Sequence, residues 1–96
     1  IENIDLVKMI CILMDELAGT KNSVDLIKFV SDRPGHDFRY ALDSSRIRAE
    51  LDWKPEYDLE NGLRETIKWY LENRDWLKNC IGGDYQKYYQ QNYGDR

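Results

Sequence analysis

The residues best suited to chemistry lie in one run, from Asp32 to Asp43. This run holds Arg33 and Arg39, the only histidine of the chain, His36, and a Pro-Gly turn. A guanidinium on a rigid turn can meet a phosphate group through two hydrogen bonds, which a lysine does less well. Because the chain has a net charge of −4, an anion site must come from a local concentration of positive charge such as this one. An ordinary charged surface turn has the same composition, so both interpretations stay open at this point.

The rest of the chain offers no set of residues for catalysis. It has no nucleophile–base pair, no P-loop and no glycine-rich turn that opens a dinucleotide site. One histidine and two distant cysteines, Cys11 and Cys80, are too few for a zinc site of ordinary ligand number. We therefore predict that these residues alone catalyse nothing and hold neither a metal nor a cofactor, and that both thiols are reduced.

Length and charge restrict the class of protein. Ninety-six residues, 42% of them hydrophobic, make one small domain at most. The acidic balance argues against nucleic-acid binding, which needs a basic face, and the longest apolar run, residues 9–14, is far too short for a membrane span. The absence of a targeting segment predicts a cytoplasmic protein. The chain begins at Ile1 directly in a helical pattern, which indicates a piece of a longer protein.

Helices are expected to position the run. Apolar spacing and capping residues predict helices over residues 3–18, 43–51, 58–73 and 74–79. Asn3, Asp43 and Asp58 are suitable N-caps for the first three, and Gly19 is a suitable stop for the first.

Two short strands are expected on either side of the Pro-Gly turn. Residues 26–30 are rich in β-branched and aromatic side chains, and residues 39–42 form a second short extended segment. The predicted fold class is therefore α+β, a small and mostly helical subdomain with short strands over residues 1–81. A tyrosine- and glutamine-rich tail, residues 82–96, follows with little apolar periodicity, and on residue chemistry alone we expect it to be disordered.

Other residues have both a structural and a functional interpretation. Asn3 is suited to capping a helix, yet a helix N-terminus is also a place where anions bind. His36 is either a satisfied structural histidine or a hydrogen-bond donor to phosphate. The tail tyrosines either belong to a disordered segment or fold back over a ligand; they are Tyr85, Tyr88, Tyr89 and Tyr93.

Several of these segments resemble the dTDP-glucose 4,6-dehydratase family. Residues 32–43, Asp-Arg-Pro-Gly-His-Asp-x-Arg-Tyr-Ala-Leu-Asp, are similar to the family signature near the C-terminus, and the Arg-Pro-Gly-His-Asp string is specific. The other matching segments are Asn-Ile-Asp-Leu-Val at 3–7, Glu-Leu-x-Trp-Lys-Pro at 50–55, Glu-x-Gly-Leu-Arg-x-Thr-Ile-x-Trp-Tyr-Leu-x-Asn at 60–73, Tyr-Gln at 85–86 and Gln-Asn-Tyr at 91–93. The tryptophan-containing segments also occur in related sugar-nucleotide epimerases and decarboxylases, which remain an alternative.

The resemblance implies an extended short-chain dehydrogenase/reductase that depends on NAD and acts as a lyase. Such an enzyme converts dTDP-glucose to dTDP-4-keto-6-deoxyglucose by hydride transfer from C4 to NAD, loss of water across C5 and C6, and return of the hydride to C6. The NAD-binding and catalytic residues of the family lie upstream of the matching part. The resemblance therefore implies that this chain is the C-terminal substrate-binding part of a homodimeric parent, inactive alone, with dTDP-glucose as its partner.

Carried over by position, the resemblance implies three places of contact with the substrate. Asn3 matches an asparagine near the substrate, and Tyr93 matches a tail tyrosine that closes over it. The diphosphate-binding loop is matched by Asp32, Arg33, Pro34, Gly35 and His36. In this loop the arginine is the main charge partner and the histidine a further donor. No catalytic, cofactor-binding or metal-binding residue is carried over.

Two positions depart from the family pattern, and one rival class of protein remains. Asp52 stands where the family usually has glycine, which aspartate replaces poorly if the backbone there is left-handed. Leu77 stands where an aromatic residue often follows Trp76, a change that concerns packing.

The rival class is a non-enzymatic module that binds a protein partner through exposed tryptophans, namely Trp53, Trp69 and Trp76.

Overall fold

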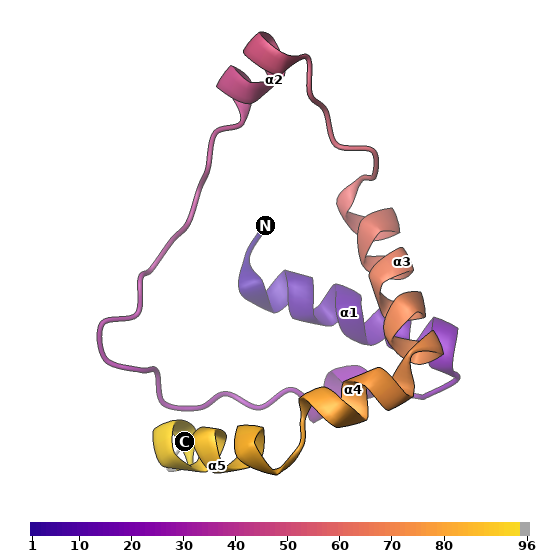
Figure 1. Ribbon diagram of the computed structural model, residues 1–96, viewed down its shortest axis with the longest axis vertical. Coiled ribbons are helices and arrows are strands. Elements are labelled where there is room, and N and C mark those ends of the chain that lie inside the picture. Colours follow the sequence, from indigo (N-terminus) through magenta and orange to yellow (C-terminus); the bar gives the residue numbers. More distant parts are fainter. Residues whose placement is uncertain (95–96) are drawn as a thin grey trace.

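A computed structural model describes residues 1–94, and within that range the regular secondary structure is helical (Figure 1). The elements are α1 (Asn3–Ala18), the 3-10 helix η1 (Ser23–Leu26), α2 (Ser45–Leu51), α3 (Leu59–Glu72), α4 (Arg74–Cys80) and α5 (Gly83–Tyr93). No helix among these residues is long and apolar enough to cross a membrane. The prediction of a small, mostly helical fold is confirmed.

The packed part of the fold is a pair of helices, α1 and α3, extended by η1 on α1 and by α4 on α3. Leu13 of α1 is 2% exposed and Ile67 of α3 is 8% exposed, and these two are the buried apolar side chains of residues 1–94. An ion pair joins the same two helices, because Arg64 Nη1 lies 2.7 Å from Glu16 Oε2. The core is therefore small and belongs to the contact between these helices.

The rest of the chain lies outside this core. In Figure 1 the segment between η1 and α2 runs along the periphery, and α1 lies inside the outline. The radius of gyration is 17.0 Å, whereas a compact domain of this length has about 12–13 Å. The accessible surface is 8977 Å², against about 5,800 Å² for a compact protein of this mass. This open shape leaves large apolar side chains such as Phe29, Phe38 and Leu42 almost fully exposed.

The two predicted strands, residues 26–30 and 39–42, are not confirmed. Leu26 ends η1, and the backbone of residues 27–30 and 39–42 pairs with no strand in the described part of the chain. These residues are of the types that favour strands, but a strand also needs a neighbour for its N–H and C=O groups. Within residues 1–94 no neighbouring strand supplies those partners.

Two of the predicted helix ends have the expected chemistry. Asp58 caps α3, since its Oδ1 accepts from the Asn61 N–H at 2.8 Å. Gly19 ends α1 with a φ of 73°, a left-handed conformation that glycine adopts without strain. Both predictions are confirmed because capping depends on local hydrogen bonds and backbone angles.

Two other predicted N-caps are wrong by one residue. Glu2 is the N-cap of α1, so Asn3 is the first helical residue. Ser44 is the N-cap of α2, yet Asp43 still satisfies a free N–H of the first turn, because its Oδ1 accepts from the Ser45 N–H at 2.9 Å. That hydrogen bond lowers the pKa of Asp43.

Asp52, where the resemblance implies a glycine, has a left-handed backbone. Asp52 follows α2 with a φ of 52° and a ψ of 28°, which is the left-handed conformation. Aspartate is one of the few residues that adopts this conformation at moderate cost. One turn earlier, the Arg48 guanidinium lies 5.8 Å from the centre of the Trp53 ring. The departure from glycine is therefore tolerated at the end of α2.

The prediction of a disordered tail is wrong for residues 83–93, which form α5. Tyr85, Tyr89 and Tyr93 recur every fourth residue, and successive ring centroids lie 6.5 Å and 5.5 Å apart. Residues at that spacing share one helix face, where aromatic contacts stabilise the helix. The division into residues 1–81 and a tail of 82–96 stays a prediction, and residues 95–96 lie outside the described part.

The loop after α1 is tied to that helix by Asp15. The carboxylate accepts hydrogen bonds from the Thr20 hydroxyl at 2.7 Å and from the N–H of Ser23 at 3.2 Å, and it also accepts from the Ser23 hydroxyl. The bond from the Ser23 hydroxyl, followed by that from Thr20, holds the pKa of Asp15 below its ordinary value.

Asp15→Asn is expected to lower the melting temperature of the chain at pH 7. An acid whose pKa is depressed by folding stabilises the fold above its unfolded pKa, and this contribution is lost as pH falls through the folded value. The difference between the two proteins should therefore shrink below about pH 4 and vanish in stronger acid. Thermal unfolding followed by circular dichroism at several pH values measures it, with Asp25→Asn, at an exposed carboxylate, as the control. A difference that stays the same at every pH would contradict the prediction.

Candidate functional site

The candidate site is the loop that connects η1 to α2, and residues 31–43 of it are exposed throughout. Pro34 and Gly35 form a turn at its centre. Gly35 has a φ of 69°, a conformation that a side chain would disfavour, whereas the ring of Pro34 holds φ at about −65°. The turn therefore reverses the chain and brings the residues on its two sides, Asp32 and His36, together.

Asp32 organises this turn with one carboxylate oxygen. Its Oδ1 accepts from the Arg33 N–H at 2.8 Å and lies 2.6 Å from Nδ1 of His36. The His36 side chain is 37% exposed and that of Asp32 is 71% exposed, so the pair lies at the surface. The five predicted loop residues therefore form one local structure, with the turn in the middle and Asp32 joining its ends.

A second contact follows on the C-terminal side of the turn. The Tyr40 hydroxyl donates to Oδ2 of Asp37 at 2.6 Å. This hydrogen bond raises the pKa of Tyr40, and the positive charge of Arg33 opposes the change. The charge of Arg33 therefore affects the hydrogen-bonded pair of Tyr40 and Asp37. Both acidic side chains close to the turn, Asp32 and Asp37, are engaged by neighbours within the loop.

The four arginines between residues 33 and 48 fall into two groups. Arg46 pairs with Glu50 at 3.2 Å, and Arg48 lies over an indole ring, so these two are engaged along α2. Arg33 and Arg39 belong to the exposed loop. The positive side chains that residues 31–43 can offer an anion are therefore those of these two arginines, with the histidine of the turn as a further donor.

The other two predicted site residues lie on separate elements. Asn3 is the exposed first residue of α1, at the positive end of the helix dipole. Tyr93 is the last residue of α5 and its ring packs against Tyr89. In Figure 1 the N-terminus lies inside the outline, whereas the loop follows its edge. A site that unites Asn3, the loop and Tyr93 stays a prediction.

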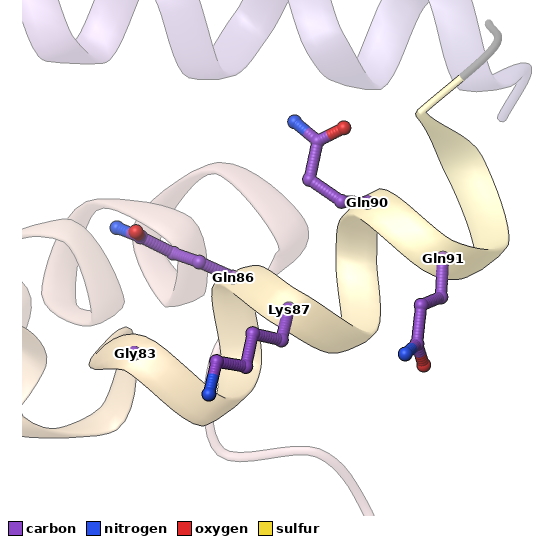
Figure 2. A pocket seen from close by; sticks show the side chains of 5 residues that line it. All are labelled: Gly83, Gln86, Lys87, Gln90 and Gln91. Carbon is purple, nitrogen blue, oxygen red and sulfur yellow. The ribbon is translucent and has the colours of Figure 1, made fainter.

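Two hollows on the described surface lie along α5 and not on the loop. One, of about 340 Å³, is lined by Tyr85, Gln86, Tyr89 and Gln90. The other, of about 520 Å³, is lined by Gly83, Gln86, Lys87, Gln90 and Gln91. In Figure 2 the side chains of the second hollow point in different directions around the helix. They converge on no common point, so we add none of them to the site.

The residues described here hold no arrangement suited to a metal. Among residues 1–94, no three His, Cys, Asp or Glu side chains form a group that could hold a metal ion. Cys11 and Cys80 are free thiols. The chemistry that the described residues offer is therefore hydrogen bonding and charge at the loop.

The tryptophans on which the rival interpretation depends lie partly in one cluster. The ring centroid of Trp69 lies 5.0 Å from that of Trp76 and 5.4 Å from that of Tyr70, both edge-on. This cluster connects α3 to α4, which gives the two tryptophans a packing role. About half of each ring-bearing side chain nevertheless stays exposed.

One comparison with known proteins gives the family. A model of the GDP-mannose 4,6 dehydratase family matches residues 1–66, which is more than half of the chain. The chain therefore belongs to this family. Residues 32–36, the organised turn of the candidate site, lie within the matched range.

Individual relatives are more specific. The chain is 47% identical over 96 residues to the dTDP-glucose 4,6-dehydratase of Shigella flexneri, covering 99% of this chain and 27% of the relative. It is 49% identical over 89 residues to that of Neisseria meningitidis, covering 88% and 25%. It is 55% identical over 76 residues to that of Haemophilus influenzae, covering 74% and 22%. The chain spans about a quarter of the length of these curated relatives and corresponds to their C-terminal part, which confirms the resemblance inferred from the motifs.

Proposed function

We propose that the chain is the substrate-binding C-terminal part of an NAD-dependent dTDP-glucose 4,6-dehydratase, an extended short-chain dehydrogenase/reductase. The parent enzyme converts dTDP-glucose to dTDP-4-keto-6-deoxyglucose. The observation that carries the proposal is 47% identity across 99% of the chain to proteins of that name. At this level of identity over the full chain, the organised Arg-Pro-Gly-His turn supports the same use of the loop.

The loop binds the diphosphate of the substrate. Arg33 is its main charge partner, since a guanidinium makes two parallel hydrogen bonds to phosphate oxygens. His36 is a further donor, and Pro34 and Gly35 shape the turn that carries both. The exposure of the loop and the ties of Asp32 within it support this assignment, because the cationic groups face solvent on a defined backbone.

Asn3 and Tyr93 contact the same substrate from the two ends of the chain. The N–H groups of the first turn of α1 are not bonded within the helix and attract negative charge, which supports the role of Asn3. The tyrosine face of α5 ends at Tyr93, whose ring and hydroxyl suit a sugar or nucleoside.

These residues do not fit a nicotinamide cofactor. The glycines stand at 19, 35, 62, 82, 83 and 94 and form no Gly-x-Gly-x-x-Gly turn between a strand and a helix. NAD therefore binds to the part of the parent enzyme that lies outside this chain, and the redox steps belong there. What this chain contributes is recognition of the nucleotide-sugar.

The remainder of the parent enzyme covers the exposed apolar surface of this chain. The accessible surface of 8977 Å² exceeds that of a compact protein of this mass by about 3,000 Å². An interface of about 1,600 Å² is already of standard size for a stable complex. This excess supports a large contact with the missing part. A homodimeric parent in the cytoplasm completes the proposal.

Turnover by the full-length protein tests the proposal. With NAD present, dTDP-glucose should be converted to the 4-keto-6-deoxy product with a kcat/KM at least about 100-fold above that for UDP-glucose. A preference for UDP-glucose would favour a related epimerase or decarboxylase. No turnover of either, with dTDP causing NMR shifts only at Trp53, Trp69 and Trp76, would favour the protein-interaction module.

A further inference from the structure

The contact between Asp32 and His36 determines more than the shape of the turn. Resting on the proposed function, we infer that Asp32 is a positioning residue that keeps a hydrogen on Nδ1 of His36, so that His36 meets the diphosphate as an imidazolium. Binding of the nucleotide-sugar then takes up one proton from solvent. Asp32 itself does not contact the phosphates, because its negative charge would oppose theirs.

The short distance assigns the hydrogen. His36 Nδ1 lies 2.6 Å from Asp32 Oδ1, and an ionised carboxylate only accepts hydrogen bonds. Nδ1 is therefore the donor in this pair. A charge-assisted N–H···O contact typically measures about 2.7–2.9 Å, so the observed contact is at least as short as the bond of an imidazolium to a carboxylate.

This assignment limits what the other ring nitrogen can do. A neutral imidazole carries one hydrogen, so with Nδ1 protonated Nε2 has only a lone pair. Facing a phosphate oxygen, that lone pair would repel another lone pair. Nε2 donates to the diphosphate only when it gains a proton of its own. The balance is one proton from solvent to Nε2 per ligand bound, and no covalent bond changes.

The surroundings of His36 allow its ring to exchange a proton with solvent. Besides His36, the charged or titratable groups of residues 31–43 are Asp32, Arg33, Asp37, Arg39, Tyr40 and Asp43. Asp37 is engaged by the Tyr40 hydroxyl at 2.6 Å, whereas Asp32 contacts the imidazole directly. Residues 31–43 are exposed throughout, so solvent reaches the ring and no helix buries it. Asp32 is thus the acidic group that acts on His36 most directly.

Calorimetry of the full-length protein with dTDP-xylose tests this inference. This ligand has no C6, so dehydration cannot follow binding, and NADH in place of NAD prevents oxidation of its C4, which would release a proton. Its diphosphate has no group that titrates near neutrality. Titrations at pH 6 to 8.5 in buffers of different ionisation enthalpy measure the protons taken up. We expect uptake to approach one proton at the upper end of this pH range, and Kd to rise there by up to about tenfold per pH unit.

Three variants separate positioning from a purely structural role. His36→Gln should bind with no proton uptake and with a Kd that does not vary with pH. Asp32→Asn removes the charge that favours a hydrogen on Nδ1, so the neutral ring can carry its hydrogen on Nε2. Proton uptake should then fall below that of wild type, and Kd should vary less with pH. Asp37→Asn removes the same charge from the same loop and should leave the profile unchanged.

The outcomes distinguish this inference from the proposed function. Binding of dTDP-xylose without proton uptake by the wild-type protein overturns the inference and leaves the proposed function standing. An Asp32→Asn profile equal to that of wild type, or an equal loss of affinity at all pH values, also overturns it. Failure of dTDP-xylose to bind the wild-type protein at any pH overturns the proposed function and the inference together.

Discussion

Replacing Arg33 with alanine in the full-length protein is expected to weaken dTDP-sugar binding by about 2–3 kcal/mol, which is about 30- to 150-fold in Kd. The loop offers two arginines, and Arg33 is the one beside the turn, with its N–H held by Asp32 at 2.8 Å. Its removal leaves the diphosphate without a charge-assisted, two-bond partner. Equilibrium binding of dTDP-xylose and the KM for dTDP-glucose measure the effect.

Two further variants sharpen this prediction. Arg33→Lys keeps the charge but loses the planar pair of donors, so its affinity should lie between those of the wild type and Arg33→Ala. Arg46→Ala removes an arginine that pairs with Glu50 on α2 and should change Kd by less than about twofold. An Arg33→Ala protein with unchanged KM and unchanged kcat would refute the assignment of this residue.

Replacing Leu13 with alanine is expected to lower the free energy of unfolding of the 96-residue chain by about 2–4 kcal/mol. Leu13 is 2% exposed and lies on α1, the helix that contacts both η1 and α3. The substitution removes three buried carbons and leaves a cavity in a core that has one other buried apolar residue, Ile67. Urea denaturation followed by circular dichroism measures the change.

The neighbouring residue provides a matched control. Ile12 has the same number of carbons as Leu13 and lies on the same helix but is 61% exposed. Ile12→Ala should change the stability by less than about 0.5 kcal/mol, partly because alanine has the higher helix propensity. Equal losses from the two substitutions would mean that the contact between α1 and α3 is not the core of the folded chain.

Local features of this protein could be read from its sequence. The end of α1 at Gly19 and the cap of α3 at Asp58 follow from backbone angles and hydrogen bonds within a few residues. The Pro34-Gly35 turn follows from the same local chemistry, and so do the identities of its cationic neighbours. Errors of one residue at Asn3 and Asp43 arise because adjacent residues compete for one cap position.

Two features that depend on contacts between residues could not be read in this way. The segment 26–30 has the composition of a strand, but composition does not supply the partner that a strand requires. The tail lacks an apolar stripe, so its pattern suggested disorder, yet three tyrosines with neighbouring, tilted rings line one face of α5. In both cases the result depends on contacts that a count of residue types does not contain.

The sequence by itself determined helices α1 to α4, the turn and, through its motifs, the family, because each depends on local chemistry or on matching strings of residues. Only the tertiary structure decided which oxygen holds His36, how Asp37 is engaged, and how little of the chain is buried. These depend on distances between atoms, such as the 2.6 Å from Asp32 to His36, and on the whole surface. The loop is therefore locally organised, on an open scaffold that leaves many large apolar side chains exposed.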